Sequence, residues 1–111
     1  MNYDLVTSNF WISAYKLKLG QEGIPLYIQK KGHEVSGAII IKLSLLDGSS
    51  KLFKRVLKID GHRIWVSDHE GKECEIDKLI LREIKRDPDL WVLAIEDKLG
   101  RHFLFDVGMD V

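Results

Sequence analysis

Charged side chains that could bind an anion flank one apolar stretch near the end of the chain. They are four acidic residues, three arginines and a histidine: Arg82, Arg86, Asp87, Asp89, Glu96, Asp97, Arg101 and His102. Guanidinium groups bind carboxylates and phosphates, and a histidine beside carboxylates can transfer protons. The alternative is that these residues form local ion pairs at a helix end and a turn. We therefore treat them as a candidate binding site and assign no catalytic residue.

Two segments superficially match the pattern of metal-dependent nucleases, in which two carboxylates and a lysine surround a divalent ion. They are Pro88-Asp89 and Glu96-Asp97-Lys98. Asp89 and Glu96 bound one predicted strand, so at ~3.3 Å per residue their side chains lie roughly 20 Å apart. One metal ion cannot bridge that distance, and we reject the nuclease hypothesis.

The sequence also contains residue types that bind zinc. They are four histidines and one cysteine: His33, His62, His69, His102 and Cys74. Their spacing matches no C-x-x-C, H-x-x-x-H or H-E-x-x-H pattern. The sequence also has no Walker loop, G-x-S-x-G motif or dinucleotide fingerprint. We predict no metal and no cofactor, and we expect surface histidines and a buried thiol.

Opposite charges occupy adjacent stretches of the chain. Residues 51–63 hold five basic side chains and one acidic one, whereas residues 68–77 hold five acidic side chains and one basic one. The basic residues Lys51, Lys54, Arg55 and Lys58 could form an anion or nucleic-acid patch. The acidic neighbour favours local compensation instead. With 17 basic and 17 acidic residues in total, we predict no nucleic-acid binding.

Two helices are predicted. Thr7-Ser-Asn9 supplies N-cap residues before an apolar pattern of helical period, which predicts a helix over residues 9–20 with Trp11 and Tyr15 in the core. Carboxylates at Glu73, Glu75 and Asp77 favour the positive end of a second helix. That helix carries apolar residues at helical spacing and ends at Asp87-Pro88, because the residue before a proline avoids the α region.

Six strands are expected, over residues 26–30, 38–46, 51–58, 63–66, 90–95 and 102–105. Residues 51–58 also fit a short helix, but their place between two Asp-Gly turns favours a strand. Residues 68–71 are predicted as a loop. The fold class is therefore α+β, with a mainly antiparallel sheet of about six strands and two helices in the order α-β-β-β-β-α-β-β.

Two details of the sheet bear on the candidate site. Lys42 and Ser44 are expected to mark the wetter face of the second strand. The apolar run from Leu90 to Ile95 indicates a strand buried on both faces. Pairing it with residues 102–105 in a final hairpin places Glu96 and Arg101 nearly opposite each other.

The length of 111 residues is sufficient for one domain, covering residues 1–111, with a frayed tail at residues 107–111. A single cysteine fits a reducing compartment. No apolar run approaches the ~18 residues that span a bilayer, and the N-terminus shows no signal peptide. These observations predict a cytoplasmic protein that does not enter membranes.

The chain resembles a family of short bacterial proteins, chiefly alphaproteobacterial, that is classed as a domain of unknown function. The resemblance rests on Leu17 to Pro25, Gly37-Ala-Ile-Ile-Ile-Lys42, Asp87-Pro-Asp-Leu-Trp91, Ile95-Glu-Asp97 and Gly100-Arg-His-Phe103. It covers nearly the whole chain. His33-Glu-Val-Ser36 departs from the aspartate-rich turn of the family. The family has no established activity, so the resemblance implies no catalytic residue.

Two hypotheses on function remain open. The first is a non-enzymatic binding or protein-interaction module, for which self-association into a homodimer is open. The second is a small enzyme or anion-binding protein that uses Asp87, Asp89, Glu96, Arg101 and His102. The corresponding partners are another protein or a small anionic ligand. The missing motifs favour the first hypothesis.

Overall fold

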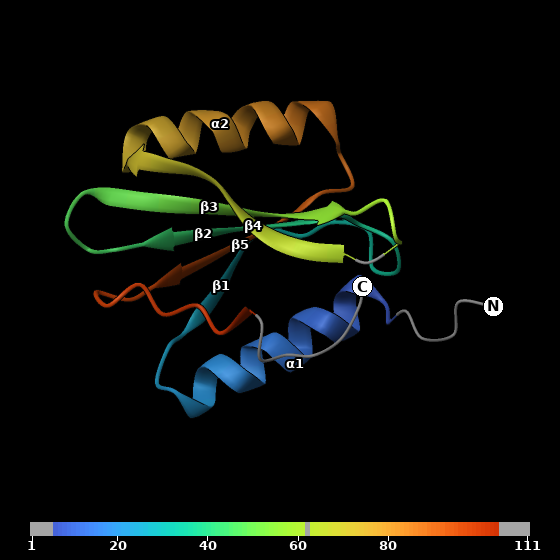
Figure 1. Ribbon diagram of the computed structural model, residues 1–111, viewed down its shortest axis with the longest axis horizontal. Helices are drawn as coiled ribbons and strands as arrows, with labels where there is room; N and C mark the ends of the chain where they lie inside the picture. Colours follow the sequence, from blue (N-terminus) through green and yellow to red (C-terminus); the bar gives the residue numbers. More distant parts are fainter. Residues whose placement is uncertain (1–5, 62, 105–111) are drawn as a thin grey trace.

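One sheet of five strands separates two helices in the computed structural model, which describes residues 6–61 and 63–104. The helix α1 lies on one side of the sheet and α2 on the other (Figure 1). In chain order, the elements are α1 (Ser8–Gln21), β1 (Leu26–Lys30), β2 (Ile39–Ser44), β3 (Ser49–Leu57), β4 (Arg63–Lys72), α2 (Glu73–Arg86) and β5 (Trp91–Glu96).

The strand order is β1-β5-β2-β3-β4, so β5, the last of the described strands, lies inside the sheet. β5 pairs antiparallel with β1 and parallel with β2, and the other neighbouring pairs are antiparallel. The α+β class is confirmed. The prediction of six strands is wrong in number, because the described sheet has five. It is also wrong in pairing, because β5 separates β1 from β2.

The apolar sequence of β5 explains its central position. Val92 packs into the core on the α2 side and Leu93 into the core on the α1 side. Both side chains are fully buried. A strand that is apolar on both faces gains most from a place with a neighbour at each edge and a layer on each face.

The predicted final hairpin does not form. Residues 101–103 are not in a strand, and Phe105 and the expected frayed tail at residues 107–111 lie outside the described residues. Both edges of β5 are already paired, with β1 and with β2, so no edge is left for a hairpin partner. The segment after β5 instead packs against α1, where the Tyr15 hydroxyl donates to the His102 carbonyl at 2.7 Å.

Residues 51–58 fall almost wholly within β3, as the favoured strand interpretation predicted. The predicted loop at residues 68–71 is wrong, because β4 continues through it to Lys72. Ser49 of β3 is paired with Lys72, so the ladder extends along the whole of β3 despite the polar sequence of β4. Pairing with a neighbouring strand thus outweighs the loop-like composition.

Both predicted helices are present. Thr7 is the N-cap of α1, and its hydroxyl accepts a hydrogen bond from the Phe10 amide at 3.1 Å. α2 has Glu73 and Glu75 in its first turn and ends just before Asp87. Negative charges near the positive end of the helix dipole stabilise the helix.

Two cores hold the layers together. The larger one lies between α1 and the sheet and includes Trp11, Tyr15 and Trp91, as expected from the sequence. The smaller one lies beneath α2 and contains Ile40, Leu52, Ile76, Ile80, Leu90 and Val92. Burial of these side chains is the main source of stability.

The loop between β1 and β2 crosses closely over the start of β5. A Cβ atom added at Gly32 would lie 2.2 Å from the Asp89 carbonyl oxygen, and one at Gly37 would lie 2.5 Å from it. Neither glycine has a positive φ angle. Glycine at position 32 is therefore required for the close approach of two backbone segments.

Candidate functional site

The eight predicted site residues fall into two groups at opposite ends of β5. Arg82, Arg86, Asp87 and Asp89 precede the strand, whereas Glu96, Asp97, Arg101 and His102 end or follow it. β5 spans six residues, which corresponds to roughly 20 Å. The two groups therefore do not converge on one small ligand, and any binding role belongs to one group or the other.

The first group is engaged locally. The Asp87 carboxylate accepts a hydrogen bond from the Asp89 amide at 3.0 Å, which closes the turn after α2. Arg86 Nη1 lies 3.6 Å from Glu83 Oε1, and its side chain is mostly exposed. Arg82 and Asp89 are exposed. These contacts match the local ion pairs and turn bonds that were the alternative to a binding site.

In the second group, Arg101 is held by Asp97. The predicted hairpin had placed Arg101 opposite Glu96 instead. Arg101 Nη2 donates to Asp97 Oδ1 at 2.8 Å, and its Nε donates to Oδ2 at 3.1 Å. The Arg101 amide also donates to Oδ2, at 2.8 Å. These bonds hold the pKa of the Asp97 carboxyl below its ordinary value. Glu96 is exposed.

His102 has a structural environment. Its ring is 4.8 Å from the Phe53 ring, centroid to centroid, and its Nδ1 accepts from the Leu104 amide at 3.1 Å. Its carbonyl accepts from the Tyr15 hydroxyl, whose burial raises the pKa of that group. These contacts fasten the segment after β5 to α1 and β3.

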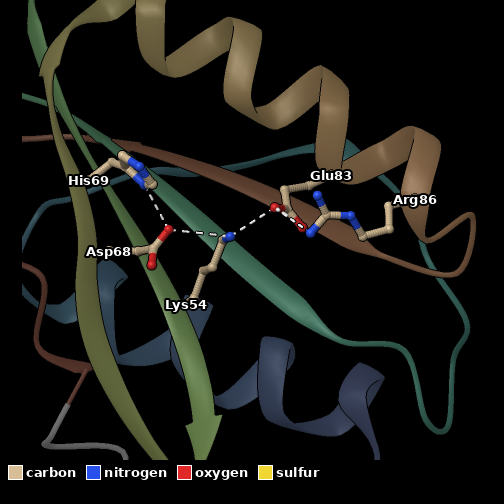
Figure 2. A network of polar contacts seen from close by, with 5 residues as sticks. All are labelled: Lys54, Asp68, His69, Glu83 and Arg86. Carbon is tan, nitrogen blue, oxygen red and sulfur yellow. Dashed lines mark hydrogen bonds and ion pairs between the residues drawn. The ribbon is translucent and has the colours of Figure 1, made fainter.

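The basic strand β3 is compensated by its acidic neighbours, as the sequence favoured. Lys54 Nζ lies 2.9 Å from Glu83 Oε1 of α2 and 3.2 Å from Asp68 Oδ2 of β4 (Figure 2). His69 and Arg86 extend this network at its two ends. Burial by itself lowers the pKa of Lys54, but hydrogen bonds to Glu83 and Asp68 outweigh it and raise the pKa. The network ties α2 to the edge of the sheet.

Lys42 is a site residue that sequence reasoning placed wrongly. Its side chain is only 9% exposed, on the α2 side of β2, and Ser44 is buried as well. Lys42 Nζ lies 2.9 Å from Glu73 Oε1 and 2.8 Å from Asp77 Oδ1. Burial lowers its pKa, but hydrogen bonds to the two carboxylates outweigh that effect and raise the pKa. The signal that could have predicted a buried ion pair was a lysine inside an apolar strand.

Beside Lys42 is a hollow of about 220 Å³ that we call the β1–β5 groove. In the pairing register, Tyr27, Ala94 and Lys42 form one row across three strands. Ala94 provides a low floor between two longer side chains. The groove is lined by Tyr27, Gln29, Lys42, Ser44, Glu73, Ala94, Ile95 and Glu96.

α2 leaves the β1–β5 groove open. The helix lies above β3 and away from the edge strand β1 (Figure 1), and its apolar partners come from β2, β3, β5 and Leu90 just before β5. Tyr27 is consequently 52% exposed. The sequence could not show this, because the exposed face of β1 depends on how far α2 reaches across the sheet.

Among residues 6–61 and 63–104, no three histidine, cysteine or acidic side chains are grouped so that they could hold a metal ion. The prediction of a buried thiol is wrong, because Cys74 is exposed on α2. In the described part of the chain, neither helix is long and apolar enough to cross a membrane.

Comparison with known proteins places the chain. A family model described as "Protein of unknown function (DUF1491)" matches residues 6–105. The chain belongs to the DUF1491 family. This confirms the resemblance that the sequence motifs indicated. A comparison with curated proteins found no match.

Three solved structures are similar to this DUF1491 protein. A crystal structure of a DUF1491 family protein from Caulobacter crescentus has 31% identity and a TM-score of 0.83, and the match covers 90% of this chain and 95% of that one. An NMR structure of a DUF1491 family protein from the same organism has 31% identity and a TM-score of 0.79, and the match covers 90% of this chain and 93% of that one. The solution structure of protein Atu0922 from A. tumefaciens has 27% identity and a TM-score of 0.69, and the match covers 82% of this chain and 85% of that one.

Proposed function

We propose that this DUF1491 protein is a non-enzymatic protein-interaction module that binds an extended segment of its partner along β1. The observation that carries the proposal is the exposure of two neighbouring large side chains on this edge strand. Tyr27 is 52% exposed and Ile28 is 50% exposed. Successive residues of a strand point to opposite faces, so a partner at this edge would contact apolar surface on both faces.

An edge strand offers backbone donors and acceptors to a further strand, and partners in several protein classes bind in this way. In the described part of the chain, β1 and β4 are the two edges of the sheet. β4 carries exposed polar residues at Asp68, His69 and Glu70, which disfavour pairing with another strand. Before its bulge between Ile28 and Lys30, β1 presents exposed apolar side chains in place of such charges, which supports its role as the binding edge.

The alternative, an enzyme or anion-binding protein, has weaker support. Asp97 already occupies the guanidinium group of Arg101 through two side-chain hydrogen bonds. An acidic ligand would either displace this carboxylate or bind the remaining guanidinium donors beside it, where two like charges repel each other. Intramolecular pairing has the advantage of proximity, so a free carboxylate competes poorly.

Affinity capture from the source organism tests the proposal with two matched variants. Ile28→Lys places a charge on the β1 edge, and Leu17→Lys places the same charge on α1, where Leu17 is 67% exposed. Both side chains are exposed enough for the fold to persist, which circular dichroism would verify. We expect wild type and Leu17→Lys to retain the same proteins, measured by quantitative mass spectrometry, and Ile28→Lys to lose them.

Retention of the same proteins by all three baits would place the interaction elsewhere on the molecule. If wild type retains nothing above a bare matrix, the interaction-module proposal itself is wrong.

A further inference from the structure

We infer that the β1–β5 groove selects a partner segment with a basic side chain, arginine or lysine, next to the strand that pairs with β1. This inference rests on the proposed function and adds the chemistry of the partner. It depends on the charge and shape of the groove, which the interaction-module proposal does not use.

The charge balance of the groove is negative. Glu73 and Glu96 line it, and Asp77 shares Lys42 with Glu73. These three carboxylates outnumber the one ammonium group, which contacts only Glu73 and Asp77. Lys42 is almost fully buried, whereas Glu96 is exposed, so the accessible charge at the rim is acidic. A cation that enters the groove would meet a favourable potential.

Tyr27 adds a second feature that suits a cation. Its exposed ring lines the groove at the sheet edge. A residue of an added strand directly opposite Tyr27 would have its Cβ atom about 5 Å from that of Tyr27. From there an arginine or lysine side chain can extend over the ring, where cation–π attraction operates, toward the carboxylate of Glu96 on β5. Shorter polar side chains do not reach the second strand, roughly 10 Å away.

The same charge argues against a second copy of this chain as the occupant. If two β1 strands paired antiparallel in one continuous sheet, the two-fold axis would be perpendicular to the sheet and both grooves would lie on the same face. Two acidic grooves would then flank the new contact and repel each other. A partner of opposite charge is favoured over self-association.

The inference is tested with short blocked peptides of alternating threonine and valine that carry either arginine or glutamate at the centre. Binding is followed by amide chemical shifts of the isotope-labelled protein. We expect the arginine peptide to perturb the amides of β1 and β5 and to bind more tightly than the glutamate peptide. Glu96→Gln should weaken arginine-peptide binding roughly two- to fivefold, and Tyr27→Leu by a similar factor.

The control variant is Glu75→Gln, which removes one exposed carboxylate from α2 outside the groove and should leave the affinity unchanged. Equal affinity for the two peptides, equal loss in both glutamate variants, or no shift in β1 with either peptide would overturn the inference. Capture with Glu96→Lys as bait separates it from the proposed function. If this bait keeps every protein that Ile28→Lys loses, the interaction module stands and the preference for a basic partner fails.

Discussion

Replacement of Trp91 by alanine should remove much of the stability of this domain. Trp91 is only 1% exposed and packs in the core beneath α1. Its indole Nε1 donates to the His33 carbonyl at 2.7 Å, and its ring lies against the loop that contains Gly32 and Gly37. The side chain thus supports both the core and the loop between β1 and β2.

The expected cost has two parts. Truncation of a buried tryptophan to alanine costs about 3–5 kcal/mol, and loss of the hydrogen bond to the His33 carbonyl, which still accepts from the Gly37 amide, adds about 1 kcal/mol. The sum, about 4–6 kcal/mol, is comparable with the total stability of a small domain, about 5–15 kcal/mol. The corresponding fall in melting temperature is on the order of 15–30 °C.

Urea unfolding followed by far-UV circular dichroism measures this loss without depending on tryptophan fluorescence. The matched control is Trp91→Phe, which keeps an aromatic ring but removes the indole N–H. We expect it to cost about 1–3 kcal/mol, between wild type and Trp91→Ala. Melting of Trp91→Ala within a degree or two of wild type would refute the assignment of Trp91 to the core.

Four further outcomes are expected. Gly37→Ala should destabilise the fold by about 1–3 kcal/mol, because the added Cβ atom would clash with the backbone just before β5. Gly20→Ala in α1 has space for the added Cβ atom and should stabilise the fold by up to about 1 kcal/mol. Urea unfolding measures both changes. Ser50→Ala should be neutral or stabilising in the same assay, since the buried Ser50 hydroxyl has no hydrogen-bond partner in the described part of the chain; a loss above about 1 kcal/mol would contradict this. Asp97→Asn should be less stable than wild type at neutral pH. Because the folded pKa of Asp97 is lowered by Arg101, the wild-type advantage should disappear as pH falls below about 4 in unfolding curves taken across the acid range. In a thermal-shift screen of carboxylates and phosphates, no ligand should stabilise wild type in a way that Arg101→Ala abolishes; one such ligand would restore the anion-site hypothesis.

Local patterns predicted both helices and the approximate positions of the five described strands, although β4 continues six residues beyond its predicted end at residue 66. Caps, helical spacing and Asp-Gly turns act over a few residues, so they can be recognised in the chain. The partners of β5 could not be recognised in this way. Its apolar sequence required two neighbours, but a hairpin with the following residues satisfied that pattern as well as insertion between β1 and β2 did.

The candidate site was predictable only in part. Local ion pairing, the alternative to a binding site, is seen for Arg86 and Arg101. Arg101 was assigned to Glu96 because a hairpin was assumed, and Asp97 holds it instead. The β1–β5 groove had no sequence signal. It arises because α2 stops short of β1 and because Ala94 lies between Tyr27 and Lys42, which is a consequence of tertiary arrangement.

The central position of β5 also affects how the protein is made. β1 to β4 and both helices precede β5 in the chain, so on the ribosome this interior strand emerges after both of its neighbours, β1 and β2. Contacts of β2, β3 and β4 are local and can form early, whereas β1 has no neighbour until β5 arrives. During that interval one edge of β2 and both edges of β1 are unpaired, and such edges attract chaperones or other nascent chains. A chain interrupted before Trp91 would keep those edges open permanently, which makes it a substrate for quality-control proteases and not a smaller version of the domain.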